Sequence, residues 1–243
     1  MTIDELKIQL DISLENELEV LKQHAYKTSY GYLFVDSSDG QCYLFDTCGK
    51  LNDIRKVKSI ENTTFYYSTS LKSITIPDSI KSIGNAVFYN CTSLESITIP
   101  DSIKSIGEYA FHGCTSLKSI TIPYSVKSIG RWAFADCTSL KSIIISDSVK
   151  SIGNGAFASC RSLRSITIPD SVKSIGYRAF AGCSSLKSIT IPYSVKSIGK
   201  EAFYKCTSLI EVIFRGKTID QVNAMDDYPW GIEDISIIKC QMS

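Results

Sequence analysis

The sequence contains little of what catalysis or metal binding usually requires. Only two histidines occur among its 243 residues, His24 and His112. Zinc sites place cysteine or histidine ligands a few residues apart, whereas most of the nine cysteines recur at long, regular intervals. No glycine-rich phosphate loop is present, and the acidic residues do not pair as acid–base chemistry requires. We therefore predict that the protein is not an enzyme and has no catalytic, metal-binding or cofactor-binding residues.

Signals for membrane insertion, export and nucleic-acid binding are missing as well. No apolar run approaches the roughly 18 residues that a membrane span needs, and residues 1–7 lack the basic and apolar regions of a secretory signal. The net charge of +1 excludes a polybasic nucleic-acid binder and an acidic tail protein. We expect a soluble protein that is cytoplasmic or associated with a particle, with leaderless export to a surface as the alternative.

The dominant feature of the sequence is a repeat with a strict period of 23 residues. A leucine recurs at this interval from Leu71 to Leu209, without insertions over six full repeats. We call the equivalent positions of successive repeats a column. Isoleucine, glycine, phenylalanine and cysteine form further columns, which begin at Ile74, Gly84, Phe88 and Cys91. A degenerate earlier repeat is visible in residues 57–60 and at Phe65.

Each repeat predicts one coil of a solenoid. In residues 71–77, the last four residues before the proline alternate polar and apolar side chains as a half-buried strand does, and the proline ends the strand. Residues 79–84 form a second extended stretch that ends at a glycine turn, and residues 85–91 form a short helical turn that inserts Phe88 and Cys91 into the core. Stacked coils bury a continuous apolar face that no single coil can bury. The predicted fold is therefore an α/β solenoid of stacked short strands and short helical turns, capped at both ends.

The repeat motif L-x-S-I-x-I-P-x-S-[IV]-K-S-I-G-x-x-A-F-x-x-C resembles the BspA-like leucine-rich repeats of bacteria and some protists. The resemblance covers residues 71–208, and its tandem matches are very specific for the fold. It implies a leucine-rich repeat solenoid that serves adhesion or protein–protein binding, often at a cell surface. For function the resemblance is less specific, because one fold hosts many functions. The sequence departs from surface-bound members of the family in lacking a signal peptide.

Three segments follow from this pattern, an N-terminal cap over residues 1–56, the solenoid over 57–208 and a C-terminal cap over 209–243. Caps are expected because open solenoid ends expose strand edges. The C-terminal segment resembles the cap of some BspA-like proteins of gut bacteria and their phages. Within it we expect, in order, a helix opened by a capping box at residues 218–221, a turn at 228–231 and a strand at 235–238.

The N-terminal cap is predicted to combine a helix with a hairpin. Leucines near one face make residues 2–22 an amphipathic helix, and Thr2 with Glu5 fits a capping box. Residues 32–35 and 42–45 are predicted as the two strands of the hairpin. We expect the helix to dock onto the first coil of a monomer, and the alternative is that it mediates oligomerisation.

The cysteine column predicts buried, structural thiols, one in each coil. Stacked coils lie about 5 Å apart, within reach of a disulfide, so disulfides between neighbouring coils are the alternative. An unpaired column in a chain without an export signal favours reduced thiols. Cys42, Cys48 and Cys240 lie in the caps and stay unassigned. His112 is close to Cys114 in the sequence, but it occupies a variable outer position, so we expect the two side chains to point apart.

Positive charge is concentrated in the repeats, since residues 71–208 carry 16 Lys+Arg and 8 Asp+Glu, a net charge of +8. Lysine fills one whole column, the lysine column: Lys81, Lys104, Lys127, Lys150, Lys173 and Lys196. A second column, the mixed column, consists of Lys72, Glu95, Lys118, Lys141, Arg164 and Lys187. Like charges about 5 Å apart in water repel by roughly 0.8 kcal/mol before screening, which an anionic partner would relieve. The alternative is a solvated edge that blocks aggregation, with counterions at Asp78, Asp101, Asp147 and Asp170.

Departures from the repeat are expected to give specificity, because identical coils cannot. Tyr124 and Tyr193 replace an aspartate near the strands, and tyrosine is a common interface anchor. The candidate partner-binding residues are therefore these two tyrosines and the lysine column. We expect a non-catalytic protein-binding or adhesion module whose partner is a protein or an anionic glycan surface, since few aromatics are placed to stack bases. The alternative function is a structural or host-recognition component of a phage particle.

Overall fold

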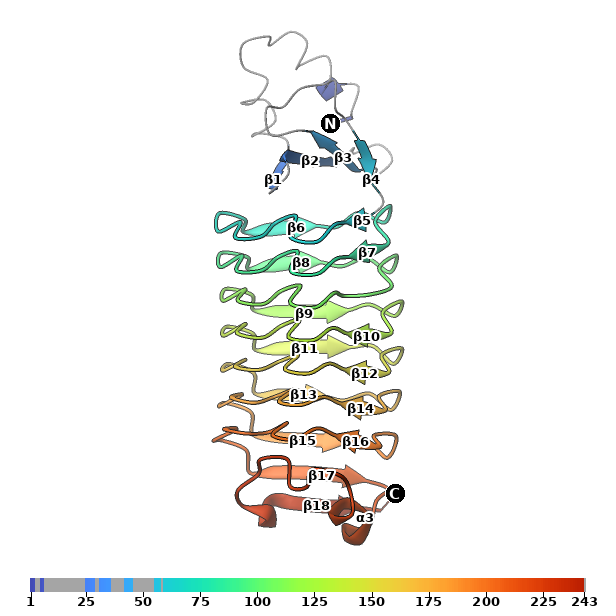
Figure 1. Ribbon diagram of the computed structural model, residues 1–243, viewed down its shortest axis with the longest axis vertical. Helices are drawn as coiled ribbons and strands as arrows, with labels where there is room; N and C mark the ends of the chain where they lie inside the picture. Colours follow the sequence, from blue (N-terminus) through green and yellow to red (C-terminus); the bar gives the residue numbers. More distant parts are fainter. Residues whose placement is uncertain are drawn as a thin grey trace.

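The chain forms an elongated solenoid whose coils stack along one axis (Figure 1). The computed structural model describes residues 1–2, 5–6, 25–28, 31–35, 42–45, 55–57 and 59–242. Each coil takes up one repeat, so that equivalent residues of successive repeats lie side by side, as Ser119 and Ser142 do. The solenoid predicted from the 23-residue period is therefore confirmed, whereas the boundaries at residues 56 and 208 remain predictions.

One side of the solenoid is a ladder of parallel strands, hydrogen-bonded in three separate sheets, that lie just before the proline position of each repeat. In the third of these strands, Ile120 and Ile122 are buried while Ser119 and Thr121 are exposed, which is the predicted alternation. Each strand contributes one rung of the continuous core. The strands are β6 (Ser73–Thr75), β8 (Ser96–Thr98), β9 (Ser119–Ile122), β11 (Ser142–Ile145), β13 (Ser165–Thr167), β15 (Ser188–Ile191) and β17 (Glu211–Arg215).

A second side carries two-residue strands that precede the glycine column. Isolated bridges from Ile106 to Ile83 and Ile129 join the strands of the first coils to the later ones. Ser59 pairs with Ser82, which confirms the degenerate first coil. The strands are β5 (Ser59–Ile60), β7 (Ser82–Ile83), β10 (Ser128–Ile129), β12 (Ser151–Ile152), β14 (Ser174–Ile175) and β16 (Ser197–Ile198).

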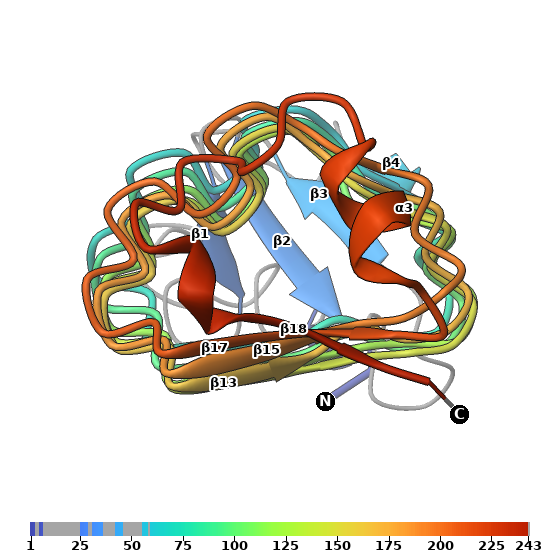
Figure 2. The same ribbon diagram turned by 90° about the horizontal axis from the view of Figure 1, so that it is seen from below.

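The third side consists of tight turns, where short helical turns were expected from the sequence. Ala86 and Asn90 have φ angles of 52° and 52°, in the left-handed region that interrupts a right-handed helix. The backbone N–H of Phe88 donates to the carbonyl of Ala110 in the next coil, at 2.7 Å. These bonds between coils replace the bonds within a helix. Seen along the axis, the three sides give each coil a roughly triangular outline (Figure 2).

Two columns fill the interior of the solenoid. The phenylalanine rings from Phe65 to Phe203 stack along the axis, with neighbouring centroids 5.1 to 5.8 Å apart. The six cysteines of the column are buried and form no disulfides, which confirms the structural thiols predicted for them. Cys240 is also free, while the side chains of Cys42 and Cys48 lie outside the described residues.

The N-terminal part contains a four-stranded antiparallel sheet, β1 (Tyr26–Thr28), β2 (Gly31–Val35), β3 (Cys42–Phe45) and β4 (Arg55–Val57). β2 and β3 are the two predicted hairpin strands, and their intervening turn lies outside the described residues. Within the helix predicted over residues 2–22, the structure describes residues 2, 5 and 6. There the reciprocal hydrogen bonds of Thr2 and Glu5 confirm the capping box, and Leu6 is fully buried.

The C-terminal segment extends the solenoid with a helix, a 3-10 turn and a strand in place of a further repeat. Thr218 and Gln221 form the predicted capping box of helix α3 (Ile219–Asn223). The strand expected at residues 235–238 begins three residues later, because Asp234 accepts a hydrogen bond from Ser236 and holds a 3-10 turn, η2 (Ile235–Ile237). β18 (Ile238–Gln241) then pairs in parallel with β17.

Candidate partner-binding surface

The lysine column follows the bend that connects the two strand ladders. Its backbone is itself a ladder, since the N–H of Lys150 donates to Lys127 at 2.7 Å and that of Lys173 donates to Lys150 at 2.8 Å. All six side chains are exposed. In the part of the chain that the structure describes, none of the six forms an ion pair, so the aspartates proposed as counterions do not reach them. The fold thus presents six regularly spaced ammonium groups without acidic partners.

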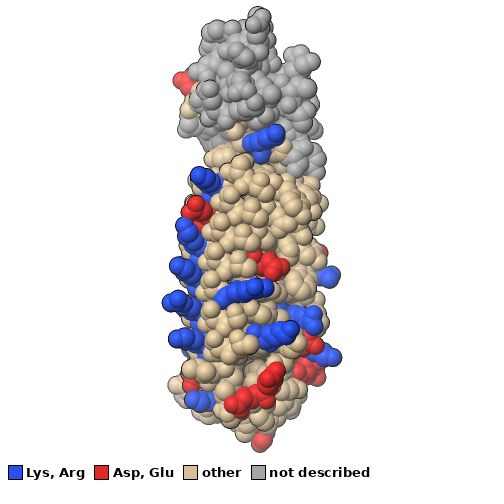
Figure 3. Space-filling model, turned by 90° about the vertical axis from the view of Figure 1, so that its left-hand side faces the viewer, with Lys and Arg blue, Asp and Glu red and all other residues tan. Residues whose placement is uncertain are grey.

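The mixed column lies just before each strand of the first ladder, and all six of its side chains are exposed. Lys118 and Glu95 pair at 2.6 Å, and this hydrogen bond and the charge of Lys118 hold the pKa of Glu95 below its usual range. Basic side chains form a file along the long axis, interrupted by an acidic one, at the edge of the face in Figure 3. The mixed column is therefore partly neutralised, unlike the lysine column.

Tyr124 and Tyr193 follow the strands β9 and β15 at equivalent positions, and their side chains are 65% and 56% exposed. The Nζ of Lys196 lies 4.2 Å from the centroid of the Tyr193 ring, and that of Lys217 lies 4.6 Å from it. No cation lies over the Tyr124 ring among the residues that are described. The structure therefore brings Tyr193 to the lysine column as a cation–π partner, and leaves Tyr124 open to solvent.

Lys217 is a basic residue that was not predicted from the sequence. Its side chain is buried, and its Nζ donates to the carbonyl of Tyr193 at 3.1 Å. Burial lowers the pKa of Lys217, and the nearby charge of Lys196 lowers it further. Lys217 occupies the place that a serine holds in the other coils. The sequence signal that could have identified Lys217 is a cationic residue at the serine position of the repeat.

The turn side carries an aromatic cluster that was likewise not predicted. The Tyr89 ring stacks on Tyr66, with centroids 4.9 Å apart, and on His112, with centroids 4.7 Å apart. His112 lies 3.7 Å from Asp136, and burial lowers the pKa of its imidazole while that carboxylate opposes the shift. Cys114 faces the interior, so the prediction that His112 and Cys114 point apart is confirmed.

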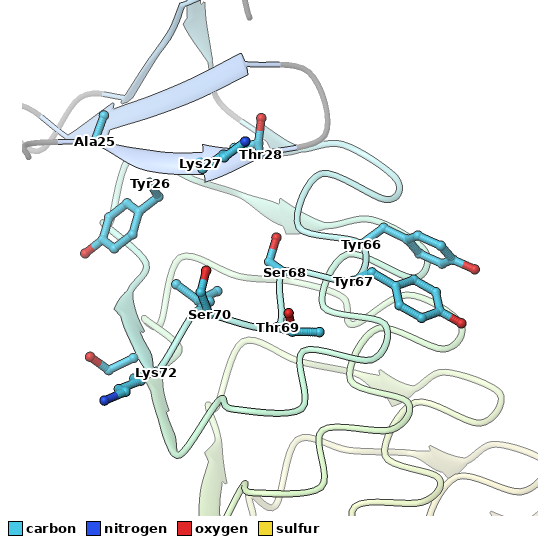
Figure 4. A pocket seen from close by; sticks show the side chains of 12 residues that line it. Ala25, Tyr26, Lys27, Thr28, Tyr66, Tyr67, Ser68, Thr69, Ser70 and Lys72 are labelled. Atoms are coloured by element: carbon cyan, nitrogen blue, oxygen red, sulfur yellow. The ribbon is translucent and has the colours of Figure 1, made fainter. Parts of the chain in front are cut away.

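A cavity of about 630 Å³ lies between β1 and the turn of the first coil. Figure 4 shows Tyr66 and Tyr67 at one end of this cavity, Tyr26 at the other, and small hydroxyl side chains between them. Its basic lining residues are Lys27 and Lys72. The cavity therefore offers hydroxyl and ring surfaces without a group poised for acid–base chemistry.

The column thiols do not provide a nucleophile. Burial raises the pKa of Cys91 and of Cys206 to about 12, so both are protonated near neutral pH. A neutral thiol is a poor nucleophile and a poor metal ligand. No group of three or more metal-ligating side chains occurs among the described residues. Within the same residues, no helix has both the length and the apolar character to cross a membrane.

Comparisons with known proteins agree with this architecture. A family model described as BspA type leucine rich repeat region (6 copies) matches residues 41–162 and 127–228. A leucine-rich repeat protein of T. pallidum is 34% identical, with a TM-score of 0.59, over 63% of this chain and 72% of that one. One from Eubacterium ventriosum ATCC 27560 is 21% identical, with a TM-score of 0.51, over 70% and 51%, and is similar in fold alone. No curated protein sequence matches significantly.

Proposed function

Since the chain belongs to the BspA-type leucine-rich repeat family, we propose that it is a non-catalytic adhesion or protein-binding module that recognises an anionic partner surface. The observation that carries the proposal is the lysine column, with six exposed ammonium groups from six successive coils and no ion pair within the described chain. Tyr124 and Tyr193 flank this column and supply aromatic contact area. The partner is an acidic protein or an anionic glycan.

The electrostatics of the column support an anionic partner. Neighbouring coils in a parallel ladder lie about 4.8 Å apart, and two like charges at that distance in water repel by roughly 0.8 kcal/mol before screening. A partner that carries negative charge at a similar spacing relieves this repulsion along the whole file. The repulsion stays in place without a partner, because the aspartates of the repeat do not pair with the lysines.

Nucleic acid fits this surface less well than protein or glycan. Proteins that bind single strands stack successive bases on aromatic side chains. Along the lysine column, the tyrosines that replace the aspartate are three coils apart, at positions 124 and 193. The surface therefore has the charge for a polyanion without the regular aromatic platform that bases require.

A charge-reversal triple variant tests the proposal. Lys104→Glu, Lys127→Glu and Lys150→Glu together invert the centre of the column, and binding to poly-L-glutamate and to a sulfated glycan is measured at two salt concentrations. We expect binding to fall by at least about tenfold at low salt, and the wild-type affinity to weaken as salt rises.

The matched control reverses three charges outside the column, at Arg131, Lys200 and Lys205, where binding should be retained. Equal losses in both triple variants, or salt-independent binding by the wild type, would remove the lysine column from the explanation. Alanine at both Tyr124 and Tyr193 tests the aromatic part, and unchanged affinity there would limit recognition to charge.

A further inference from the structure

The last bends of the lysine column border a basic pocket. This cavity has a volume of about 670 Å³ and is lined by the turns after β13 and β15 and by the end of β17. Its lining includes three cationic residues, Lys173, Lys196 and Arg215, and one carboxylate, Asp170. The remaining lining residues are Tyr193, Ser194 and Gly216.

The charges of this pocket are not balanced within the protein. Among the described residues, neither the two lysines nor Arg215 forms an ion pair. Three cations against one carboxylate leave a net charge of +2 at the lining (+3 from Lys173, Lys196 and Arg215, −1 from Asp170). A phosphate monoester carries a charge of about −1.5 to −2 near neutral pH, which matches this excess more closely than a carboxylate or a sulfate ester does.

A buried hydroxyl in the pocket lacks a partner. In earlier coils the equivalent serine donates to the carbonyl 22 residues before it, as Ser148 does to Val126 and Ser171 to Val149, both at 2.6 Å. The Oγ of Ser194 is buried and has no hydrogen-bond partner in the described part of the chain. A buried hydroxyl without a partner costs free energy, and an oxyanion in the pocket supplies the missing acceptor.

The sequence of the last coil explains how the pocket forms. Where the preceding coil has Pro192, Tyr193 and Ser194, the last coil has Arg215, Gly216 and Lys217. The loss of proline lets β17 continue to Arg215, which pairs with Gln241 of β18. Gly216 packs against the Tyr193 side chain. A Cβ added to Gly216 would lie 3.3 Å from the Cβ of Tyr193. Lys217 packs behind the same ring and adds a fourth positive charge near the pocket.

We infer that this pocket is a binding site for a phosphate monoester group, held by Lys173, Lys196 and Arg215 with the Ser194 hydroxyl as a further donor. The three cations contact the oxygens of the phosphate group from the last two bends of the column and the end of β17. The Ser194 hydroxyl determines how deeply the phosphate group enters the pocket. The inference does not depend on the proposed function, because one phosphate group occupies the last two bends whereas partner binding uses the whole column.

An NMR titration of the full chain tests the inference. Backbone amide shifts are followed as inorganic phosphate is added at constant ionic strength and pH 7.5, with N-acetyl-phosphoserine amide as a second arm that separates free phosphate from its esters. We expect saturable shifts centred on Ser194 and Gly216. Arg215→Ala should weaken the affinity by about tenfold, as expected for the loss of a charge-assisted hydrogen bond. Lowering the pH below the second pKa of the phosphate ester, about 6, should also weaken binding of the ester.

Lys127→Ala is the matched control, because Lys127 follows Tyr124 by three residues, as Lys196 follows Tyr193. It should leave phosphate affinity unchanged. Shifts of equal size at Ser125 and Ser194, equal affinity for sulfate and phosphate, or no effect of Arg215→Ala would each overturn the inference. Those outcomes leave the charge-reversal test of the lysine column unaffected, so failure of the pocket and failure of the proposed function are distinguishable.

Discussion

The thiol of Cys137 donates a hydrogen bond to the carbonyl oxygen of Phe111, with Sγ and O 3.1 Å apart. The same carbonyl accepts the backbone N–H of Cys114 at 3.2 Å, so both of its lone pairs are used. Equivalent thiol bonds join the other coils of the cysteine column. The cysteine column therefore links successive coils through the core without forming disulfides.

This arrangement leads to a prediction for thiol labelling. The column thiols are buried and hydrogen-bonded, and burial raises their pKa, to about 12 for Cys91. Because the thiolate is the reactive form, we expect the six column thiols of the native protein to resist a thiol-specific dye at pH 8 and to react at once in denaturant. Rapid labelling of all nine cysteines in the folded protein would contradict this assignment.

The same thiols should make the fold sensitive to alkali. An ordinary thiol pKa of 9.0 applies to the unfolded chain, whereas that of Cys206 is raised to about 12 in the fold. Between these values the unfolded chain has lost a proton that the folded chain keeps, so stability is complete below about pH 9 and falls as pH rises toward 12. Each such thiol contributes a slope of about 1.4 kcal/mol per pH unit.

Unfolding in denaturant at several pH values measures this effect. Lysine and tyrosine titrate in the same range, so the comparison is between the wild type and Cys206→Ala. In the variant, the free energy of unfolding should fall less steeply with pH, by the contribution of one thiol. A pH dependence equal to that of the wild type would contradict the predicted effect of Cys206.

Two glycines should respond differently to substitution. A Cβ on Gly130 would lie 2.5 Å from the carbonyl oxygen of Gly107, a backbone atom of the stacked coil that cannot move aside. We expect Gly130→Ala to destabilise the protein by about 3 kcal/mol, as overpacking does. Gly182 has a φ of +75°, a Cβ there would make ordinary van der Waals contact with Ser159 at 3.5 Å, and asparagine already occupies the equivalent position at Asn90. Gly182→Asn should therefore change stability by less than about 1 kcal/mol. Denaturant unfolding of both variants checks the contrast, and equal costs would contradict it.

His112 predicts an acid sensitivity. Burial depresses the pKa of its imidazole below 6.5, although Asp136 opposes the shift. The unfolded chain therefore takes up a proton at a pH where the folded chain does not, and stability falls as pH drops below about 6.5. His112→Tyr places there the residue found at Tyr89 and Tyr204. We expect the variant to lose less stability than the wild type between pH 7.5 and 5, as measured by thermal unfolding at each pH. A larger loss in the variant would contradict the direction of the shift.

The periodic part of the structure was predictable from the sequence, because every coil repeats the same burial. The isoleucine, phenylalanine and cysteine columns point inward as expected, because a strict period places all residues of a column in the same environment. The local geometry of the turn side was not predictable. Residues 85–91 have a composition compatible with a helical turn, and the choice of left-handed angles at Ala86 and Asn90 follows from hydrogen bonds to the next coil.

The candidate surface was predictable only where it follows the repeat. The lysine column could be found from its spacing, and Tyr193 from its departure from that spacing. Lys217 is recognisable in the sequence as a cation at a serine position of the repeat, but the places of Lys217 and Arg215 beside Tyr193 depend on the pairing of β17 with β15. The aromatic cluster on the turn side was predictable in part. Tyr66, Tyr89 and His112 stack along one column of the repeat, whereas the contact of Tyr109 with His112 joins two different positions, which a comparison column by column does not connect.

The phenylalanine column gives a final test of how the coils hold together. Phe134 is fully buried and stacks on Phe111 at 5.1 Å and on Phe157 at 5.5 Å, so its removal opens a cavity between these two rings. We expect Phe134→Ala to cost about 3–5 kcal/mol in the free energy of unfolding and Phe134→Leu distinctly less. Because a repeat protein is stabilised by the packing of neighbouring coils, such a central break should also separate the denaturant transition into two steps. A cost below about 1 kcal/mol in the alanine variant would mean that the ring stack is not what holds the coils together.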